Sequence, residues 1–135
     1  FEFFRFMIDY RRRHPIIRKK LPNAVCGMEP LHAHDVMAEK VELPKGTRTF
    51  SISFAGYDRE TGRDDLVYVS VNTYWEDVRI TLPHLDNMAA WYLSVNTYGD
   101  GEGRYCYEEG TEVRIKREFI LRPRSVAVFT GRAKS

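Results

Sequence analysis

Cysteine and long apolar runs are both scarce in this sequence. No run approaches the roughly 18 apolar residues of a membrane helix, so we expect no membrane partner. Cys26 and Cys106 stand far apart, without a C-x-x-C partner or a zinc-ligand spacing. We therefore expect two reduced, buried thiols, with a disulfide as the weaker alternative. A secretory signal with a basic region and a small-residue cleavage site is also missing, which predicts a cytoplasmic location.

An excess of charge of one sign is missing too. The 21 Lys and Arg residues against 19 Asp and Glu residues leave a formal net charge of +2, too small to indicate a nucleic-acid partner. Most of the basic excess falls in residues 1–20. Its cluster at 11–14 is expected at the C-terminal end of a helix, where cations meet the negative pole of the helix dipole. We interpret this cluster as a solvated helix end rather than a phosphate or lipid site.

No complete catalytic motif is present. The sequence has no nucleophile elbow, no phosphate-binding loop and no Cys/His pair in a recognisable local context. Acid–base catalysis needs two carboxylates that face one cleft, whereas the adjacent pairs at 64–65, 76–77 and 108–109 are expected to point apart. We interpret them as solvated loop residues and predict no catalytic residue in this chain.

Short segments with alternating apolar and polar residues fill most of the 135 residues, and that period of two is typical of β-strands. The segments 66–72 and 78–82, separated by turn residues, predict an antiparallel hairpin. The segment 48–56 predicts a strand with Phe50, Ile52 and Phe54 inward and its Thr and Ser residues outward. Further strands are expected at 89–97, 111–115, 118–121 and 125–129, the last two joined by a turn at 122–124.

This pattern predicts one all-β domain, an antiparallel β-sandwich of the Greek-key type, preceded by one N-terminal α-helix. The strand 89–97 is expected to place Trp91, Leu93 and Val95 on one apolar face, with Trp91 in the core. Buried aromatic side chains contribute much of the apolar area that a small core needs.

The N-terminal helix is expected at Phe1–Arg13 and is apolar on two sides. Its apolar residues are Phe1, Phe4 and Ile8 on one side, and Phe3, Phe6, Met7 and Tyr10 on the other. A helix with so much apolar circumference is normally buried from two directions, and the rest of the chain is expected to supply only one. Because residue 1 is Phe rather than Met, we expect the chain to be a fragment or a processed product. We also expect the isolated chain to dimerise through the Phe1–Tyr10 helix.

Two histidines invite comparison with a metal site. His32-x-His34, followed by Glu39, resembles the metal-binding strand pair of cupins, and two imidazoles with a carboxylate suit a first-row metal. The second cupin segment and its further His are missing, and an incomplete ligand set rarely holds a metal. We therefore predict no metal and no cofactor. His32 and His34 are expected on one face of a strand, half exposed, and a metal site at His32, His34 and Glu39 is the weaker alternative.

Aromatic residues near two turns are candidates for sugar contact. The heptapeptides YVSVNTY (68–74) and YLSVNTY (92–98) are an internal repeat, and each ends in Asn-Thr-Tyr. Loop ends at one pole of a sandwich often carry sites. Trp75 follows the first repeat, so Trp75, Tyr74 and Tyr98 are the predicted carbohydrate contacts. For Trp75, packing and ligand contact remain equally open.

Four segments in order resemble the C-terminal part of a debranching enzyme of the α-amylase superfamily (glycoside hydrolase family 13), the group of glycogen-debranching enzymes, isoamylases and pullulanases. They are IDYRRRHP at 8–15, VNTYWE at 71–76 with Leu82-Pro83, the strand from Trp91 to Thr97, and PRSV at 123–126. Asn96 stands where the family commonly has Asp, and the stretch after His34 lacks the Trp-rich approach of isoamylase-like members. The debranching subfamily therefore stays open.

The resemblance implies that residues 1–20 are the last helix of a (β/α)8 barrel with its connector, and that 21–135 form the C-terminal β-sandwich domain. The implied function is a non-catalytic domain of an enzyme that cleaves α-1,6-glucosidic bonds in glycogen or starch by a retaining two-carboxylate mechanism. The family's catalytic Asp, Glu and Asp match no position here. The implied partners are the upstream barrel, which the domain stabilises, and an α-glucan. Two alternatives remain: a stand-alone carbohydrate-binding module centred on Trp75, and a cupin-type metal-binding protein.

Overall fold

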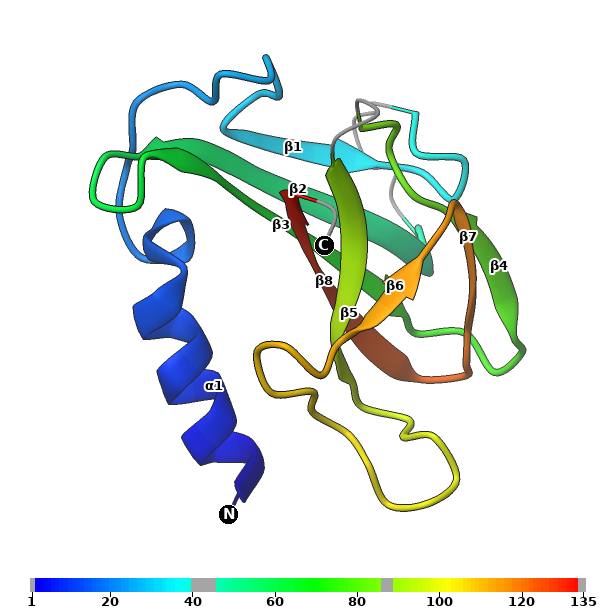
Figure 1. Ribbon diagram of the computed structural model, residues 1–135. Helices are drawn as coiled ribbons and strands as arrows, with labels where there is room; N and C mark the ends of the chain where they lie inside the picture. Colours follow the sequence, from blue (N-terminus) through cyan, green and yellow to red (C-terminus); the bar gives the residue numbers. More distant parts are fainter. Residues whose placement is uncertain (1, 40–45, 86–88, 134–135) are drawn as a thin grey trace.

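The computed structural model describes residues 2–39, 46–85 and 89–133 (Figure 1). Its elements are α1 (Glu2–Arg13), the 3-10 helix η1 (Pro15–Ile17), β1 (Leu31–His34), β2 (Thr49–Asp58), β3 (Arg63–Asn72), β4 (Val78–Thr81), β5 (Ala89–Asn96), β6 (Val113–Ile115), β7 (Glu118–Leu121) and β8 (Ser125–Ala133). Within the described part of the chain, no helix is long and apolar enough to span a membrane.

The strands form two antiparallel sheets. The larger has the order β1-β2-β3-β8-β5-β6, and the smaller pairs β4 with β7. The helix α1 lies on one side of the large sheet and the β4–β7 pair on the other (Figure 1). The predicted all-β sandwich with one N-terminal helix is therefore confirmed.

The main core lies between the two sheets. Tyr68, Trp91 and Phe129, from β3, β5 and β8, pack there with Ile80 of β4. Trp91 is 2% exposed, as predicted for a core residue, and its indole N–H donates to the carbonyl oxygen of Pro83 at 2.8 Å. The buried polar atom of this large side chain is thus satisfied.

A second core lies between the large sheet and the N-terminal segment. Phe6 and Tyr10 of α1 and Ile16 of η1 pack against Val67 of β3 and Val128 of β8. The central strands of the large sheet are therefore buried on both faces, a condition more typical of parallel sheets than of antiparallel ones.

This second core overturns the predicted orientation of β2. Ser51 and Ser53 face inward and are buried, whereas Phe54 faces the N-terminal segment. The serine hydroxyls remain satisfied, because Ser51 Oγ lies 2.7 Å from Ser70 Oγ and Ser53 Oγ lies 2.8 Å from His34 Nε2. The outer face is apolar because α1 and η1 cover part of it.

The predicted hairpin at 66–82 is wrong, because β3 and β4 belong to different sheets. β3 pairs with β2 and β8, and β4 pairs with β7. Asn72 explains the change of sheet: its side-chain amide donates to the carbonyl oxygens of Glu76, Leu121 and Arg122 at 2.9, 3.2 and 3.1 Å. The turn at 122–124 likewise joins β7 to β8 in the other sheet, rather than closing a hairpin.

Two smaller predictions also need correction. A register shift between Leu93 and Val95 in β5 turns Val95 away from Trp91 and into the second core, because an extra residue in a strand moves the following side chain to the other face. Cys26 is exposed and Cys106 is partly buried, and both are free thiols. Cys26 lies in an irregular segment at the surface, so its predicted burial is wrong.

Candidate functional site

The internal repeat forms two equivalent turns at one end of the large sheet. It ends β3 and β5, which both flank the beginning of β8. Asn72 Oδ1 accepts from the backbone N–H of Tyr74 at 2.9 Å, and Asn96 Oδ1 accepts from that of Tyr98 at 3.2 Å. Each Asn thus closes an Asx turn, and the chain leaves the sheet on both sides of β8 (lower right in Figure 1).

Trp75 projects from the first of these turns. It is 68% exposed, so its indole is not packed in the core, and ligand contact stays a prediction. Its ring meets that of Tyr74 edge to face, with 6.0 Å between centroids and 88° between planes. The guanidinium of Arg48 lies 5.2 Å from the centroid of the Tyr74 ring. Tyr74 therefore contacts both Arg48 and an indole that is mostly open to solvent.

Arg122 connects the two turns. One of its guanidinium nitrogens lies 3.0 Å from Asp77 Oδ2, and its guanidinium carbon lies 4.9 Å from the centroid of the Tyr98 ring. Tyr98 is 50% exposed. An ion pair at this exposure adds little stability, but it fixes the direction of the guanidinium group beside the half-exposed Tyr98 ring. Sequence reasoning missed Arg122 and Arg48, whose positions depend on contacts between distant segments.

His32 and His34 lie on one face of β1, as predicted, but His34 is buried rather than half exposed. Its Nδ1–H donates to the carbonyl oxygen of Ala38 at 3.0 Å, and its Nε2 lies 2.8 Å from Ser53 Oγ. His34 is buried because residues 35–39 fold over the end of β1, with the Glu39 backbone N–H donating to Asp35 Oδ1 at 2.9 Å.

The histidines do not converge as metal ligands. His32 Nδ1–H donates to the carbonyl oxygen of Ala33 at 2.8 Å, and its Nε2 lies 3.3 Å from Glu29 Oε2. With Glu39, both rings line a cavity of about 370 Å³. Among the described residues, no three His, Cys, Asp or Glu side chains are grouped to hold a metal ion. A metal ligand needs a lone pair on its ring nitrogen, and both nitrogens of His34 are engaged in hydrogen bonds.

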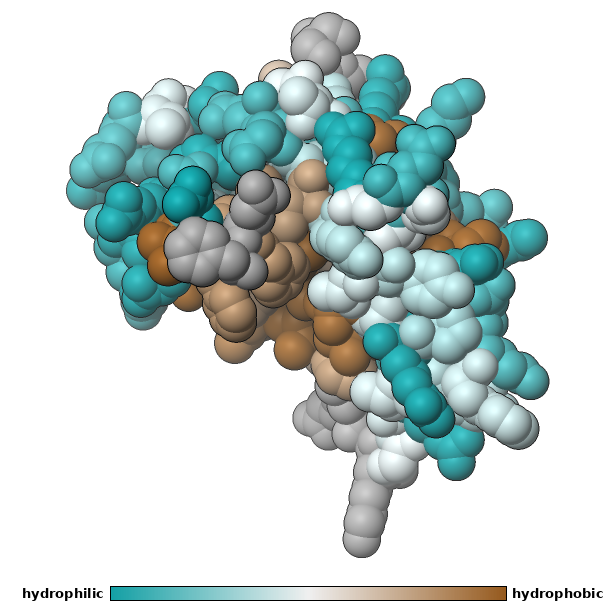
Figure 2. Space-filling view, turned by 90° about the horizontal axis from the view of Figure 1, so that it is seen from below, coloured by the Kyte–Doolittle hydropathy of each residue, from teal (hydrophilic) through white to brown (hydrophobic). Residues whose placement is uncertain are grey.

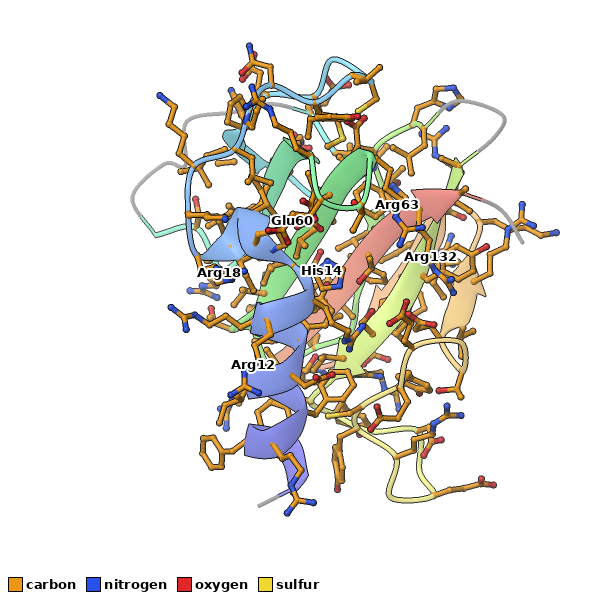
Figure 3. All side chains as sticks on the ribbon, turned by 60° about the vertical axis from the view of Figure 1, so that its left-hand side comes forward. Arg12, His14, Arg18, Glu60, Arg63 and Arg132 are labelled. Carbon is orange, nitrogen blue, oxygen red and sulfur yellow. The ribbon has the colours of Figure 1, made fainter. Side chains whose placement is uncertain are left out.

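A charged groove of about 330 Å³ lies where α1 meets the turn between β2 and β3 (Figure 3). Its labelled side chains are Arg12, His14, Arg18, Glu60, Arg63 and Arg132. His14 is not solvated as predicted, because its Nδ1 lies 2.7 Å from Oδ1 of the buried Asp65. Arg11 and Arg12 are exposed, as a solvated helix end requires. Carboxylates and guanidinium groups both line this groove, so it has no clear preference for an anion.

The helix α1 has one buried and one exposed apolar side. Phe6 and Tyr10 are buried, whereas Phe4 is 72% and Ile8 57% exposed. A groove of about 670 Å³ runs along the exposed side, where Glu108 joins it from the segment after β5. Figure 2 shows a continuous apolar area between hydrophilic surfaces on the face that carries the N-terminal end of α1. The predicted two-sided helix is confirmed for residues 2–13, and Phe1 lies outside the described residues.

Neither a known family model nor a curated protein sequence matches this chain. The resemblance to debranching enzymes therefore stays a prediction.

Proposed function

We propose that this chain is a non-catalytic β-sandwich domain of a debranching glycoside hydrolase, and that it packs on the catalytic (β/α)8 barrel through α1. One observation carries the proposal: α1 uses one apolar side to hold the sandwich and leaves Phe4 and Ile8 open on the other. The last helix of a barrel that is followed by a sandwich needs both sides apolar, since it has a neighbour in each direction.

The exposed side of α1 has the composition of an interface. Phe4 and Ile8 form its apolar centre, and Arg5, Asp9 and Glu108 line the same groove. Interfaces commonly combine an apolar centre with a polar rim. Full burial of a large apolar side chain contributes about 1.5–3 kcal/mol, so a barrel that covers this side would be stabilised by the domain.

The carboxylates of Asp64 and Asp65 attach the N-terminal segment to the large sheet. Asp64 accepts hydrogen bonds from the backbone N–H groups of Val25 and Cys26, at 2.7 and 2.9 Å. Its neighbour Asp65 is buried and bonds His14 and the backbone N–H of Ile16, which corrects the prediction that it is solvated. Both carboxylates of this pair line the charged groove beside α1, and their oxygens are engaged in holding the N-terminal segment on the sheet.

The reading frame upstream of the Phe1 codon tests the proposal first. We expect barrel strands that end in the Asp, Glu and Asp of the α-amylase superfamily. A start codon directly before Phe1, or an unrelated domain, would overturn it.

A reconstitution experiment tests the contact itself. The upstream barrel and this chain are produced separately and mixed, and complex formation is followed by light scattering together with hydrolysis of pullulan. We expect the chain to form a one-to-one complex and stabilise the barrel. The double variant Phe4→Ser, Ile8→Ser is expected to lose the complex, whereas Val25→Ser, at another exposed apolar residue, keeps it. Equal behaviour of the two variants would contradict the proposed contact.

A further inference from the structure

We infer that the turns at the end of the large sheet form a binding platform for a neutral sugar chain, with Trp75 and Tyr98 as stacking surfaces and the Arg122–Asp77 ion pair as the source of polar contacts. The choice of an α-glucan as the sugar rests on the proposed function. The platform itself rests on the geometry of the turns.

The turn that carries Trp75 is held in place before any ligand arrives. Asn72 is buried, and its side chain bonds the carbonyl oxygen of Glu76 and the backbone N–H of Tyr74, on either side of Trp75. The carbonyl oxygen of Tyr74 accepts from the backbone N–H of Arg124 at 3.1 Å. Rigid turns cost less conformational entropy when a ligand binds, so this indole is pre-organised for contact.

Exposed aromatic rings of this kind match the faces of pyranose rings. The C–H groups on one face of a sugar carry partial positive charge, and the face of an aromatic ring carries partial negative charge. Trp75 is exposed two positions before Asp77, and Tyr98 is half exposed with the Arg122 guanidinium 4.9 Å from its ring centroid. The Arg122–Asp77 ion pair offers both N–H donors and carboxylate acceptors to sugar hydroxyl groups, and bonds to charged groups are stronger than those between neutral groups.

The charges favour a neutral ligand over a polyanion. Arg122 is paired with Asp77, Arg48 lies against the Tyr74 ring, and Glu76 adds a further negative charge at the turn. Arg124 is exposed in the turn before β8, and Glu76 and Asp77 stand against the three arginines. Binding of nucleic acid depends on several cations directed at phosphates, which a surface of such mixed charge does not favour.

The chain suits a direct binding assay because it has two tryptophans, one exposed and one buried. Maltoheptaose is titrated into the intact chain while tryptophan emission and backbone amide NMR shifts are recorded. We expect saturable changes centred on Trp75, Tyr98 and Arg122, with little change at Trp91. The variant Trp75→Ala is expected to weaken binding by about tenfold, the loss of one good stacking contact. Phe4→Ala removes an exposed aromatic ring elsewhere and is expected to bind like the wild type.

Three results would overturn the inference. The first is the absence of any saturable change with maltoheptaose, and the second is an unchanged affinity in Trp75→Ala. The third is equal binding of cellohexaose, which would contradict the assignment to an α-glucan. The assay uses no barrel and leaves α1 intact. Its failure would therefore not affect the proposed contact with the barrel, and a missing barrel would not remove sugar binding by the turns.

Discussion

Tyr10 in α1 and Thr130 in β8 share a buried hydrogen bond, with 2.6 Å between their hydroxyl oxygens across 120 positions of the chain. Thr130 Oγ1 also lies 2.8 Å from Ser94 Oγ, so three hydroxyl groups join the helix to two strands. The ring of His14 stacks against that of Tyr10 with 4.2 Å between centroids, and it bonds Asp65. These contacts fix which side of α1 faces the sheet, and therefore which side stays exposed.

Removing the Tyr10 hydroxyl should weaken this attachment measurably. Tyr10→Phe keeps the ring in the core and leaves Thr130 and Ser94 able to bond each other, so we expect a loss of about 1 kcal/mol in the free energy of unfolding. Urea denaturation followed by circular dichroism measures it. Tyr105→Phe, at an exposed ring, is the control and should change stability by less than about 0.5 kcal/mol. An equal effect of the two substitutions would contradict a role for the hydroxyl bond.

The raised pKa of the buried Tyr68 phenol leads us to expect a loss of stability at alkaline pH. Burial raises the pKa of its phenol from 10.0 to about 12. Between these values the unfolded chain loses a proton that the folded chain keeps. The contribution of this residue is therefore fully present below about pH 10 and falls by about 1.4 kcal/mol per pH unit above it, until the folded-state pKa is reached.

The variant Tyr68→Phe isolates this contribution. The buried Tyr68 hydroxyl makes no well-formed hydrogen bond among the described residues, although the nearby Ser51 acts against the rise of its pKa, so we expect the variant to be about as stable as the wild type at neutral pH. Its free energy of unfolding should then fall less steeply than that of the wild type above about pH 10. Parallel pH profiles for the two proteins would disprove the assignment to Tyr68.

We expect substitution of the equivalent asparagines in the two repeats, Asn72 and Asn96, to lower stability by different amounts. Asn72 donates to three carbonyl oxygens as well as closing its Asx turn, whereas Asn96 accepts from the backbone N–H of Tyr98 in its own Asx turn. We expect Asn72→Ala to cost about 2–3 kcal/mol, because it removes the donor to the buried Leu121 carbonyl and two further bonds that join the turn to the end of β7, and Asn96→Ala to cost about 1 kcal/mol. Thermal denaturation of both variants measures the difference, and equal losses would show that Asn72 does not hold the two sheets together.

Local patterns predicted the elements but not their partners. The period of two located β2, β3, β5, β7 and β8, and the spacing of Phe and Tyr residues located a helix with two apolar sides. The inward face of β2 could not be predicted from alternation, because both faces of the large sheet are covered. Ser51 and Ser53 can be buried only because Ser70 and His34 supply their bonds, and these partners lie far away in the sequence.

The candidate sugar platform was predictable only in part. An aromatic residue after a turn motif is visible in the sequence, so Trp75, Tyr74 and Tyr98 could be named. Arg122 could not, since it reaches Asp77 across 45 positions through the pairing of β4 with β7. That pairing contradicts the hairpin expected at 66–82, and a wrong strand pairing places the wrong side chains next to a turn.

The exposed side of α1 predicts that the isolated chain self-associates. Phe4 and Ile8 can escape water by packing against the same side of a second copy, and interfaces in symmetric dimers use one patch twice. We expect sedimentation equilibrium to give an apparent mass that rises with concentration towards that of a dimer. The double variant Phe4→Ser, Ile8→Ser should stay monomeric, and the matched control Met37→Ser, at an exposed side chain away from the helix, should behave like the wild type. A wild-type chain that stays monomeric at high concentration would contradict self-association through this side of α1.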